Sequence, residues 1–119
     1  MDHVGEVFYT DDFGEWYDTL DLTDQGAVDD KVDLLAVAGV GLGRPHTGTI
    51  HGSNVAMREL VVQSKGRPLR VFYCFDPRRN AILIIGGDKT GDGRFYERMI
   101  PLAEKIWRDY LREVGLDRK

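Results

Sequence analysis

Cysteine is almost absent from the sequence, and no long apolar run interrupts it. The one cysteine, Cys74, can form neither an internal disulfide framework nor a zinc site built from cysteines. The purest apolar run covers residues 81–85, far short of the roughly 18 residues that a membrane span needs. The N-terminal residues lack a basic segment followed by an apolar stretch, so we expect no secretory signal and a cytoplasmic protein.

Length and composition narrow the class of protein further. The 119 residues suit one domain over residues 1–119, and 42% apolar with 30% charged residues is ordinary for a globular protein. A chain of this length buries about two thirds of its unfolded surface, so its core needs no disulfide or metal to hold it together.

The formal net charge of −4 is unevenly distributed along the chain. Residues 1–40 contain eleven acidic residues and one lysine, a balance of −10, whereas residues 41–119 contain fifteen basic and nine acidic residues, a balance of +6. Such a split indicates an anionic partner for the basic part. The acidic part is then either the side turned away from that partner or a face for a basic segment of another protein. The alternative is that both parts are simply solvated surfaces.

Residue patterns predict a strand, two helices, three strands and a final helix. β-branched and aromatic residues mark a strand over 4–9. Thr10 is suited to cap a helix that reaches Leu20, and Thr23 to cap a second helix that reaches about residue 38. The glycine-rich stretch 39–54 is predicted to be a loop. Three strands and a helix are expected after it: 55–63, 69–75, 81–85 and 95–115.

This order, β-α-α-β-β-β-α, predicts an α+β fold. We expect a small antiparallel sheet with the helices packed on one face, which leaves the other face free to bind a ligand.

No motif in the chain indicates a metal or a cofactor. The glycines at 39, 41 and 43 have neither the spacing nor the preceding strand of a dinucleotide-binding fingerprint. The stretch 88–93 begins like a calcium loop, but Met99 occupies the twelfth position, where a carboxylate is needed. His3 lies in the terminus, and His46 and His51 lie in a loop, five residues apart with no nearby carboxylate, so the histidines do not indicate a metal site. We therefore expect neither a metal nor a cofactor.

Basic and aromatic residues are left as the candidate functional set. Arg70 stands out because it lies among Leu69, Val71 and Phe72 in a strongly apolar strand, where a charge needs a purpose. The other members are Arg58, Lys65, Arg67, Lys89, Arg94 and Tyr96. A sheet face lined by such residues suits a phosphodiester backbone with a stacked base. The alternative is that the charges are solubilising and that the tyrosine ring only packs.

Five segments, taken in order, resemble the RelE/ParE toxin superfamily, and within it the phage-derived HigB-type toxins of type II toxin–antitoxin modules. The resemblance runs from about residue 4 to residue 114. The segments are Leu-Gly-Arg-Pro at 42–45, Met-Arg-Glu-Leu at 57–60, Leu-Arg-Val-Phe-Tyr-Cys-Phe-Asp-Pro at 69–77, Gly-Asp-Lys-Thr at 87–90 and Phe-Tyr-Glu-Arg-Met-Ile-Pro at 95–101.

The resemblance implies a compact RelE-like fold and a toxin that cleaves mRNA, commonly on the ribosome, and so inhibits translation. It also implies a cognate helix-turn-helix antitoxin as partner. By the same resemblance Arg70 contacts the scissile phosphate, Lys89 matches the lysine of a Gly-Lys loop, and Tyr96 contacts the RNA. Arg58 matches a basic residue on the preceding strand. Thr90 stands where RelE-like toxins carry an arginine, so the part of that arginine in stabilising the transition state is missing unless Arg94 takes it over.

The residues fit this chemistry because the 2′-hydroxyl of RNA can act as the nucleophile. The protein then has to orient the phosphate, neutralise developing charge and assist proton transfer. We expect Arg70 and Arg58 to hold the phosphate, Lys89 to stabilise charge or move a proton, and Tyr96 to stack on or position a base. The residues expected to bind RNA nearby are Lys65, Arg67, Arg94 and Arg98.

Two other functions share this fold and stay open at the level of sequence. ParE-type members poison DNA gyrase and lack the basic catalytic set. A degenerate toxin could survive only as an antitoxin-binding module.

Overall fold

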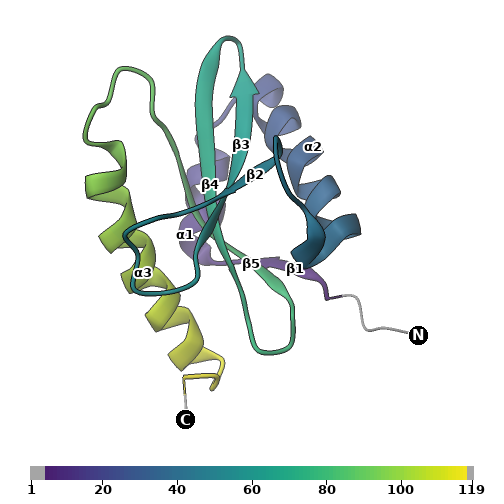
Figure 1. Cartoon of the computed structure of the whole chain (residues 1–119). Helices are drawn as coiled ribbons and strands as arrows, with labels where there is room; N and C mark the ends of the chain where they lie inside the picture. Colours follow the sequence, from purple (N-terminus) through teal and green to yellow (C-terminus); the bar gives the residue numbers. More distant parts are fainter. Residues whose placement is uncertain (1–4, 118–119) are drawn as a thin grey trace.

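The computed structural model describes residues 5–117, so His3 and Val4 of the sequence-based predictions lie outside the described part of the chain. The elements follow one another as β1 (Val7–Tyr9), α1 (Asp11–Asp18), α2 (Leu22–Ala38), the short 3-10 helix η1 (Gly39–Gly41), β2 (Thr47–Thr49), β3 (Arg58–Ser64), β4 (Arg67–Phe75), β5 (Ala81–Asp88) and α3 (Phe95–Glu113). Figure 1 shows α3 on one side of the β3–β4 hairpin and α2 on the other.

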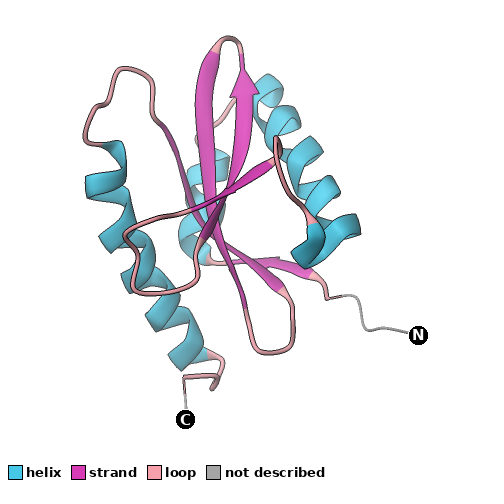
Figure 2. Ribbon diagram, viewed as in Figure 1, coloured by secondary structure: helices cyan, strands magenta, loops and turns pink. Residues whose placement is uncertain are grey.

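The strands form one five-stranded sheet in the order β1-β5-β4-β3-β2. β1 pairs parallel with β5, and the other neighbouring strands pair antiparallel. The predicted α+β class is confirmed, with one strand more than expected (Figure 2). The additional strand, β2, lies in the stretch 39–54 that its glycines predict to be a loop, and its Thr-Gly-Thr sequence is too short to show an alternating pattern.

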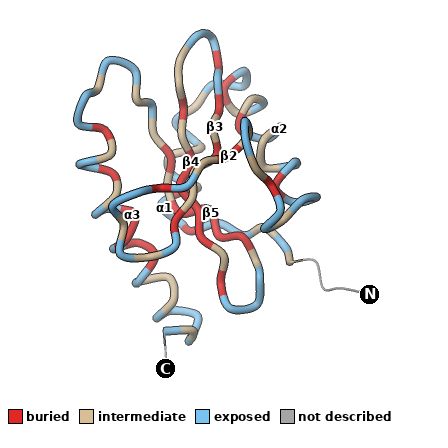
Figure 3. Tube along the Cα trace, viewed as in Figure 1, coloured by how far each residue is buried: buried red, intermediate tan, exposed pale blue. Residues whose placement is uncertain are grey.

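The helices cover both faces of the sheet, which corrects the expectation that they pack on one face. Val71 and Tyr73 of β4 pack in a core with α1 and α2, whereas the alternate residues Phe72 and Cys74 pack in a second core with α3. Successive side chains of a strand point to opposite faces, so a strand that is apolar on both sides needs a cover on each. Figure 3 shows buried residues along the central strands, between the two helical layers.

Polar side chains fix the beginnings of the first two helices. The Thr10 hydroxyl accepts a hydrogen bond from the Phe13 amide at 3.0 Å, as its N-cap position predicts. The second helix begins earlier than predicted, because Asp21 rather than Thr23 accepts the capping hydrogen bond, from the Asp24 amide at 2.9 Å.

Cys74 is a core residue, as expected from its place in a strand. Its side chain is 2% exposed, and burial raises the pKa of the thiol to about 12, so the thiol stays protonated. Within residues 5–117, no helix combines the length and the apolar character that crossing a bilayer requires.

Replacement of Gly86 and of Gly26 with alanine is expected to change the free energy of unfolding in opposite directions. A Cβ at Gly86 of β5 would come within 2.3 Å of the Trp16 ring, whereas a Cβ at Gly26 of α2 would meet nothing within 4 Å. We expect Gly86→Ala to lower the free energy of unfolding by about 1–3 kcal/mol through overpacking. Gly26→Ala should raise it by up to about 1 kcal/mol, because alanine is the better helix former. Urea unfolding followed by circular dichroism measures both, and a stable Gly86→Ala variant would contradict the packing described.

Candidate functional site

Arg70 lies on the face of the sheet that α3 covers. It alternates with the buried Phe72 of the α3 core and pairs across the sheet with Val61 on β3 and Gly87 on β5. Its side chain is only 12% exposed, and its guanidinium Nη1 donates to the Leu69 carbonyl at 3.0 Å. The Nε of Arg70 is buried and lies 3.6 Å from Oε1 of Glu59, without a hydrogen bond to it. The Arg70 guanidinium is therefore held in place, while its Nε–H has no hydrogen-bond acceptor among the described residues.

Tyr96 and Lys89 join the same group. The Tyr96 hydroxyl donates to Oε1 of Glu59 at 2.8 Å, and the Lys89 ammonium donates to the Tyr96 hydroxyl at 3.3 Å. The Lys89 nitrogen also lies 5.0 Å from the centre of the Tyr96 ring, in cation–π contact. We call Glu59, Arg70, Lys89 and Tyr96 the Arg70 cluster.

The local structure explains why these four residues meet. Tyr96 is in the first turn of α3, and the preceding Phe95 ring packs against Gly87, where a Cβ would come within 2.9 Å of it. The glycine thus lets the start of α3 approach the sheet beside Arg70. Lys89 follows β5 directly, and its amide donates to the Pro68 carbonyl at 3.0 Å, which fixes its loop against β4.

The electrostatics of the cluster keep the Tyr96 hydroxyl protonated at neutral pH. Burial raises the pKa of Tyr96, and the hydrogen bond to the Glu59 carboxylate raises it further, against the opposing charge of Arg70. The cluster therefore gathers three proton donors around one carboxylate: Tyr96 donates to Glu59, Lys89 donates to Tyr96, and Nε of Arg70 lies 3.6 Å from Glu59. Such a set can bind an anion and accept a proton at one place.

Arg58, expected to hold the same phosphate as Arg70, lies on the other face of the sheet. It pairs with Tyr73 of the α1/α2 core, and its guanidinium approaches the Val40 carbonyl at 3.5 Å. Its charge acts on the Tyr73 hydroxyl, whose pKa burial raises and Arg58 lowers. Arg58 and Arg70 thus do not meet within the sheet.

Arg58 shares a groove over β2, an edge strand of the sheet, with one residue of the Arg70 cluster. The groove has a volume of about 640 Å³, and both Arg58 and Glu59 line it. Arg44 and His51 line the same groove and are exposed. The groove therefore joins a cationic surface to the carboxylate of the Arg70 cluster.

The expected RNA-binding residues Lys65 and Arg67 are paired with acidic residues of the first half of the chain. Lys65 forms an ion pair with Asp21, and Arg67 forms one with Asp24 and another with Asp88, the latter at 2.8 Å. The two-residue hairpin turn, with positive φ at Lys65 (52°) and Gly66 (77°), holds both basic side chains near the start of α2. The acidic and basic parts of the chain are therefore in direct contact here.

Arg94 and Arg98, also expected to bind RNA, lie at the start of α3 near Tyr96. Both are exposed. Arg98 pairs with Asp92 at 2.8 Å and covers the Phe95 ring at 5.9 Å, and Arg94 makes no ion pair within the described residues. Arg94 is thus the freer of the two charges beside the cluster.

Asp24 gives a prediction about stability and pH. Asp24 is buried, accepts a hydrogen bond from the Ser64 hydroxyl at 2.6 Å and forms an ion pair with Arg67. The hydrogen bond from Ser64, and after it the one from Arg67, lowers the pKa of the Asp24 carboxyl below its ordinary 3.8. A lowered folded-state pKa stabilises the protein above pH 3.8, and the gain is lost as pH falls through the lowered value. We expect Asp24→Asn to lower Tm by several degrees at neutral pH, with a gap that narrows in acid. Asp30→Asn, exposed on the same helix, is the control, and an equal gap at both pH values would contradict the expectation.

Glu59 is the member of the cluster that sequence reasoning missed. Its carboxylate is 13% exposed and contacts both Arg70 and Tyr96. The one signal in the sequence is a carboxylate beside Arg58 in a strand of apolar residues. Among residues 5–117, no group of three or more histidine, cysteine or acidic side chains is placed to hold a metal ion.

Comparison with known proteins identifies the family of the chain. Residues 15–108 match the family described as "Phage derived protein Gp49-like (DUF891)". The chain belongs to the Gp49-like family. Two relatives come from Mycobacterium tuberculosis (strain ATCC 25618 / H37Rv). "Putative toxin HigB3" is 36% identical over 98 residues, which cover 81% of this chain and 84% of the relative. "Putative toxin HigB2" is 31% identical over 113 residues, which cover 92% of this chain and 56% of the relative.

These matches confirm the resemblance to phage-derived, HigB-type proteins that the five segments indicate. No solved structure matches the chain significantly. The Gp49-like match extends from α1 to α3 and contains all four residues of the Arg70 cluster.

Proposed function

We propose that the protein is the toxin of a type II toxin–antitoxin module and that it cleaves mRNA on the ribosome. The proposal places its action in the cytoplasm, where it stops translation and growth. Its Gp49-like membership and its two relatives named as HigB toxins support the toxin class. The Arg70 cluster is the observation that favours a nuclease.

The cluster supplies what RNA cleavage by the 2′-hydroxyl requires. Arg70 keeps guanidinium donors beyond those bonded to Leu69, and a guanidinium can hold two oxygens of one phosphate. Lys89 adds a second positive charge, and its hydrogen bond to the Tyr96 hydroxyl holds the ammonium at the cluster. The start of the long helix α3 adds the positive end of its dipole beside the same place. A pentacoordinate phosphate, which gains negative charge in the transition state, would be stabilised there.

Proton transfer in the proposed reaction uses Glu59 and Lys89. The Glu59 carboxylate accepts the proton of the RNA 2′-hydroxyl as the 2′-oxygen forms a bond to phosphorus. The bond from phosphorus to the 5′-oxygen breaks, and the Lys89 ammonium gives that oxygen a proton. The products are a 2′,3′-cyclic phosphate and a 5′-hydroxyl. Tyr96 holds Glu59 in position through its hydrogen bond of 2.8 Å and offers its ring to a base.

The other basic residues surround the cluster and contact the RNA backbone in the proposed complex. The groove over β2, with Arg44 and Arg58, receives the RNA backbone on one side, and Arg94 with Arg98 receives it on the other. Lys65 and Arg67 have a smaller part, because their charges are matched by Asp21, Asp24 and Asp88. A helix-turn-helix antitoxin is the proposed partner, and no metal or cofactor takes part.

Induction of the wild-type chain in a bacterial host tests the proposed function. Mapping of 5′ ends by primer extension should show new ends inside translated regions of a reporter transcript. The same reporter with a disabled start codon is the matched control and should stay intact. Plasmid supercoiling should not change. Altered supercoiling without new transcript ends would contradict the proposal and favour a gyrase poison.

A further inference from the structure

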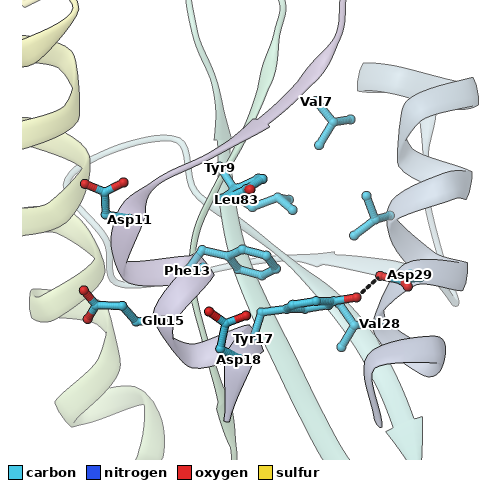
Figure 4. Close-up of a pocket in the computed structure, with 12 residues that line it drawn as sticks. Val7, Tyr9, Asp11, Phe13, Glu15, Tyr17, Asp18, Val28, Asp29 and Leu83 are labelled. Atoms are coloured by element: carbon cyan, nitrogen blue, oxygen red, sulfur yellow. Dashed lines mark hydrogen bonds between the residues drawn. The ribbon is translucent and has the colours of Figure 1, made fainter. Parts of the chain in front are cut away.

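A second concave surface lies on the face of the sheet opposite the Arg70 cluster. It is a groove of about 710 Å³ between β1, α1 and α2. Figure 4 shows Tyr9 from β1 and Phe13 and Tyr17 from α1 facing it, with Val28 and Asp29 from α2 on its far side. We call it the α1–α2 groove.

The floor of the groove is apolar and aromatic. Phe13 is buried, with the Tyr9 ring at 5.8 Å on one side and the Tyr17 ring at 5.9 Å on the other. Val28 and Leu83 add further apolar lining. Tyr9 remains 64% exposed at the wall, a large amount for an aromatic side chain beside a cavity.

The rim of the groove is acidic, and among residues 5–117 no basic residue lines it. The acidic residues that line it are Asp11, Glu15, Asp18 and Asp29; Asp18 and Asp29 lie beside Tyr17, and the carboxylates of Asp11 and Glu15 lie on the outer side of α1 (Figure 4). Asp11, Glu15 and Asp18 form no ion pair within residues 5–117, whereas Asp21 and Asp24, close by in sequence, are paired with Lys65 and Arg67. Asp29 accepts a hydrogen bond from Tyr17 at 2.8 Å, which keeps its carboxylate at the rim. These unneutralised charges set the chemistry of an occupant.

We propose that the α1–α2 groove binds a cationic, apolar segment of a partner protein. Apolar side chains of that segment would cover Tyr9 and Phe13, and its lysines or arginines would pair with the acidic rim. A peptide segment fits better than a small cation because β1 forms one edge of the sheet, with β5 on its other side. An extended segment can therefore pair with the edge of β1 that adjoins no other strand of residues 5–117, and place alternate side chains in the groove beside Val7 and Tyr9.

The groove and the Arg70 cluster lie on opposite faces of the sheet, so the groove's occupant does not contact the cluster. The cluster is on the α3 face, and the groove lies between α1 and α2. A partner held only at the groove leaves Arg70 and Tyr96 uncovered. This proposal is thus independent of the nuclease proposal, and either can fail without the other.

A selection of random peptides displayed on phage tests the proposal with the purified chain as the target. We expect the enriched peptides to combine lysine or arginine with apolar residues. A labelled synthetic copy of an enriched peptide is then measured by fluorescence anisotropy. The double variant Glu15→Lys/Asp18→Lys should weaken its binding by at least about tenfold, because both side chains are exposed at the rim. Tyr9→Ser should also weaken it, through loss of apolar contact.

The matched control is Asp30→Lys/Asp33→Lys on α2. Both residues are exposed and lie outside the groove, so this variant changes the net charge equally but should bind within about twofold of wild type. Circular dichroism checks that all variants are folded. Equal weakening in both double variants, enrichment of acidic or uncharged peptides, or no enrichment would overturn the proposal.

Discussion

Replacement of Arg70 with alanine is expected to lower the rate of mRNA cleavage by about 10²–10³-fold, the usual effect of removing one donor that stabilises a charged transition state. The Arg70 side chain is 12% exposed, and its guanidinium is held by the Leu69 carbonyl beside the Glu59 carboxylate, so its donors are already oriented when a phosphate arrives. Primer extension on a ribosome-bound transcript measures the effect. Growth arrest after induction should disappear in parallel.

Two further variants separate charge, geometry and stability in the Arg70 experiment. Arg70→Lys keeps the charge but loses the planar pair of donors, so we expect it to recover only a small part of the activity. Arg78→Ala removes an exposed arginine from the β4–β5 turn and should cleave like the wild type. Thermal melting checks that each variant is folded. A folded Arg70→Ala variant that still arrests growth and cleaves mRNA would remove Arg70 from the site.

Three of the four residues in the Arg70 cluster could be predicted from the sequence. Arg70 is conspicuous as a charge in an apolar strand, and Lys89 and Tyr96 lie in segments that resemble a known family. Glu59 could not be predicted, because its role depends on a contact with Tyr96, 37 residues away in sequence. That contact requires both the β3–β4 register and the approach of α3 to Gly87.

The placement of Arg58 shows how register limits such predictions. Adjacent residues of a strand point to opposite faces, so one step separates Arg58 on the α1/α2 face from Glu59 in the cluster. In the sequence, Leu60, Val61 and Val62 are all apolar, and the pattern does not show which face is which. Leu60 and Val62 are buried with α1 and α2, and this packing decides the orientation of Arg58.

The split of charge along the chain does not produce two separate surfaces. Asp21 and Asp24 of the acidic part bind Lys65 and Arg67 of the basic part, because the β3–β4 turn lies beside the start of α2. The charges without an ion pair among residues 5–117 are more informative: Asp11, Glu15 and Asp18 at the α1–α2 groove, and Arg94 at the start of α3. The distribution of charge along the sequence predicted an acidic and a basic surface. The ion pairs determine which charged residues on each surface remain able to bind a partner.

Replacement of Glu59 with glutamine is expected to lower cleavage by about 10²-fold or more while mRNA binding is unchanged or tighter. Glutamine keeps the size of the side chain and can still accept from the Tyr96 hydroxyl, so Arg70 and Tyr96 should stay in place. It cannot take a proton from the 2′-hydroxyl, and it removes a negative charge that repels the phosphate. Binding is measured with an uncleavable RNA carrying a 2′-deoxy substitution at the scissile nucleotide.

The two measurements distinguish proton acceptance by Glu59 from a purely structural role. If Glu59 only braces Arg70 and Tyr96, Glu59→Gln should cleave at nearly the wild-type rate, because glutamine keeps the contact with the Tyr96 hydroxyl. Tyr96→Phe, which deletes the hydroxyl that contacts Glu59 at 2.8 Å, should then lower cleavage more than Glu59→Gln does. If Glu59 accepts the proton, Glu59→Gln should be far more damaging than Tyr96→Phe, because the phenylalanine variant keeps the carboxylate and the ring. Cleavage by Glu59→Gln at close to the wild-type rate would therefore exclude the carboxylate as the base and leave Arg70 and Lys89 to act by electrostatics alone.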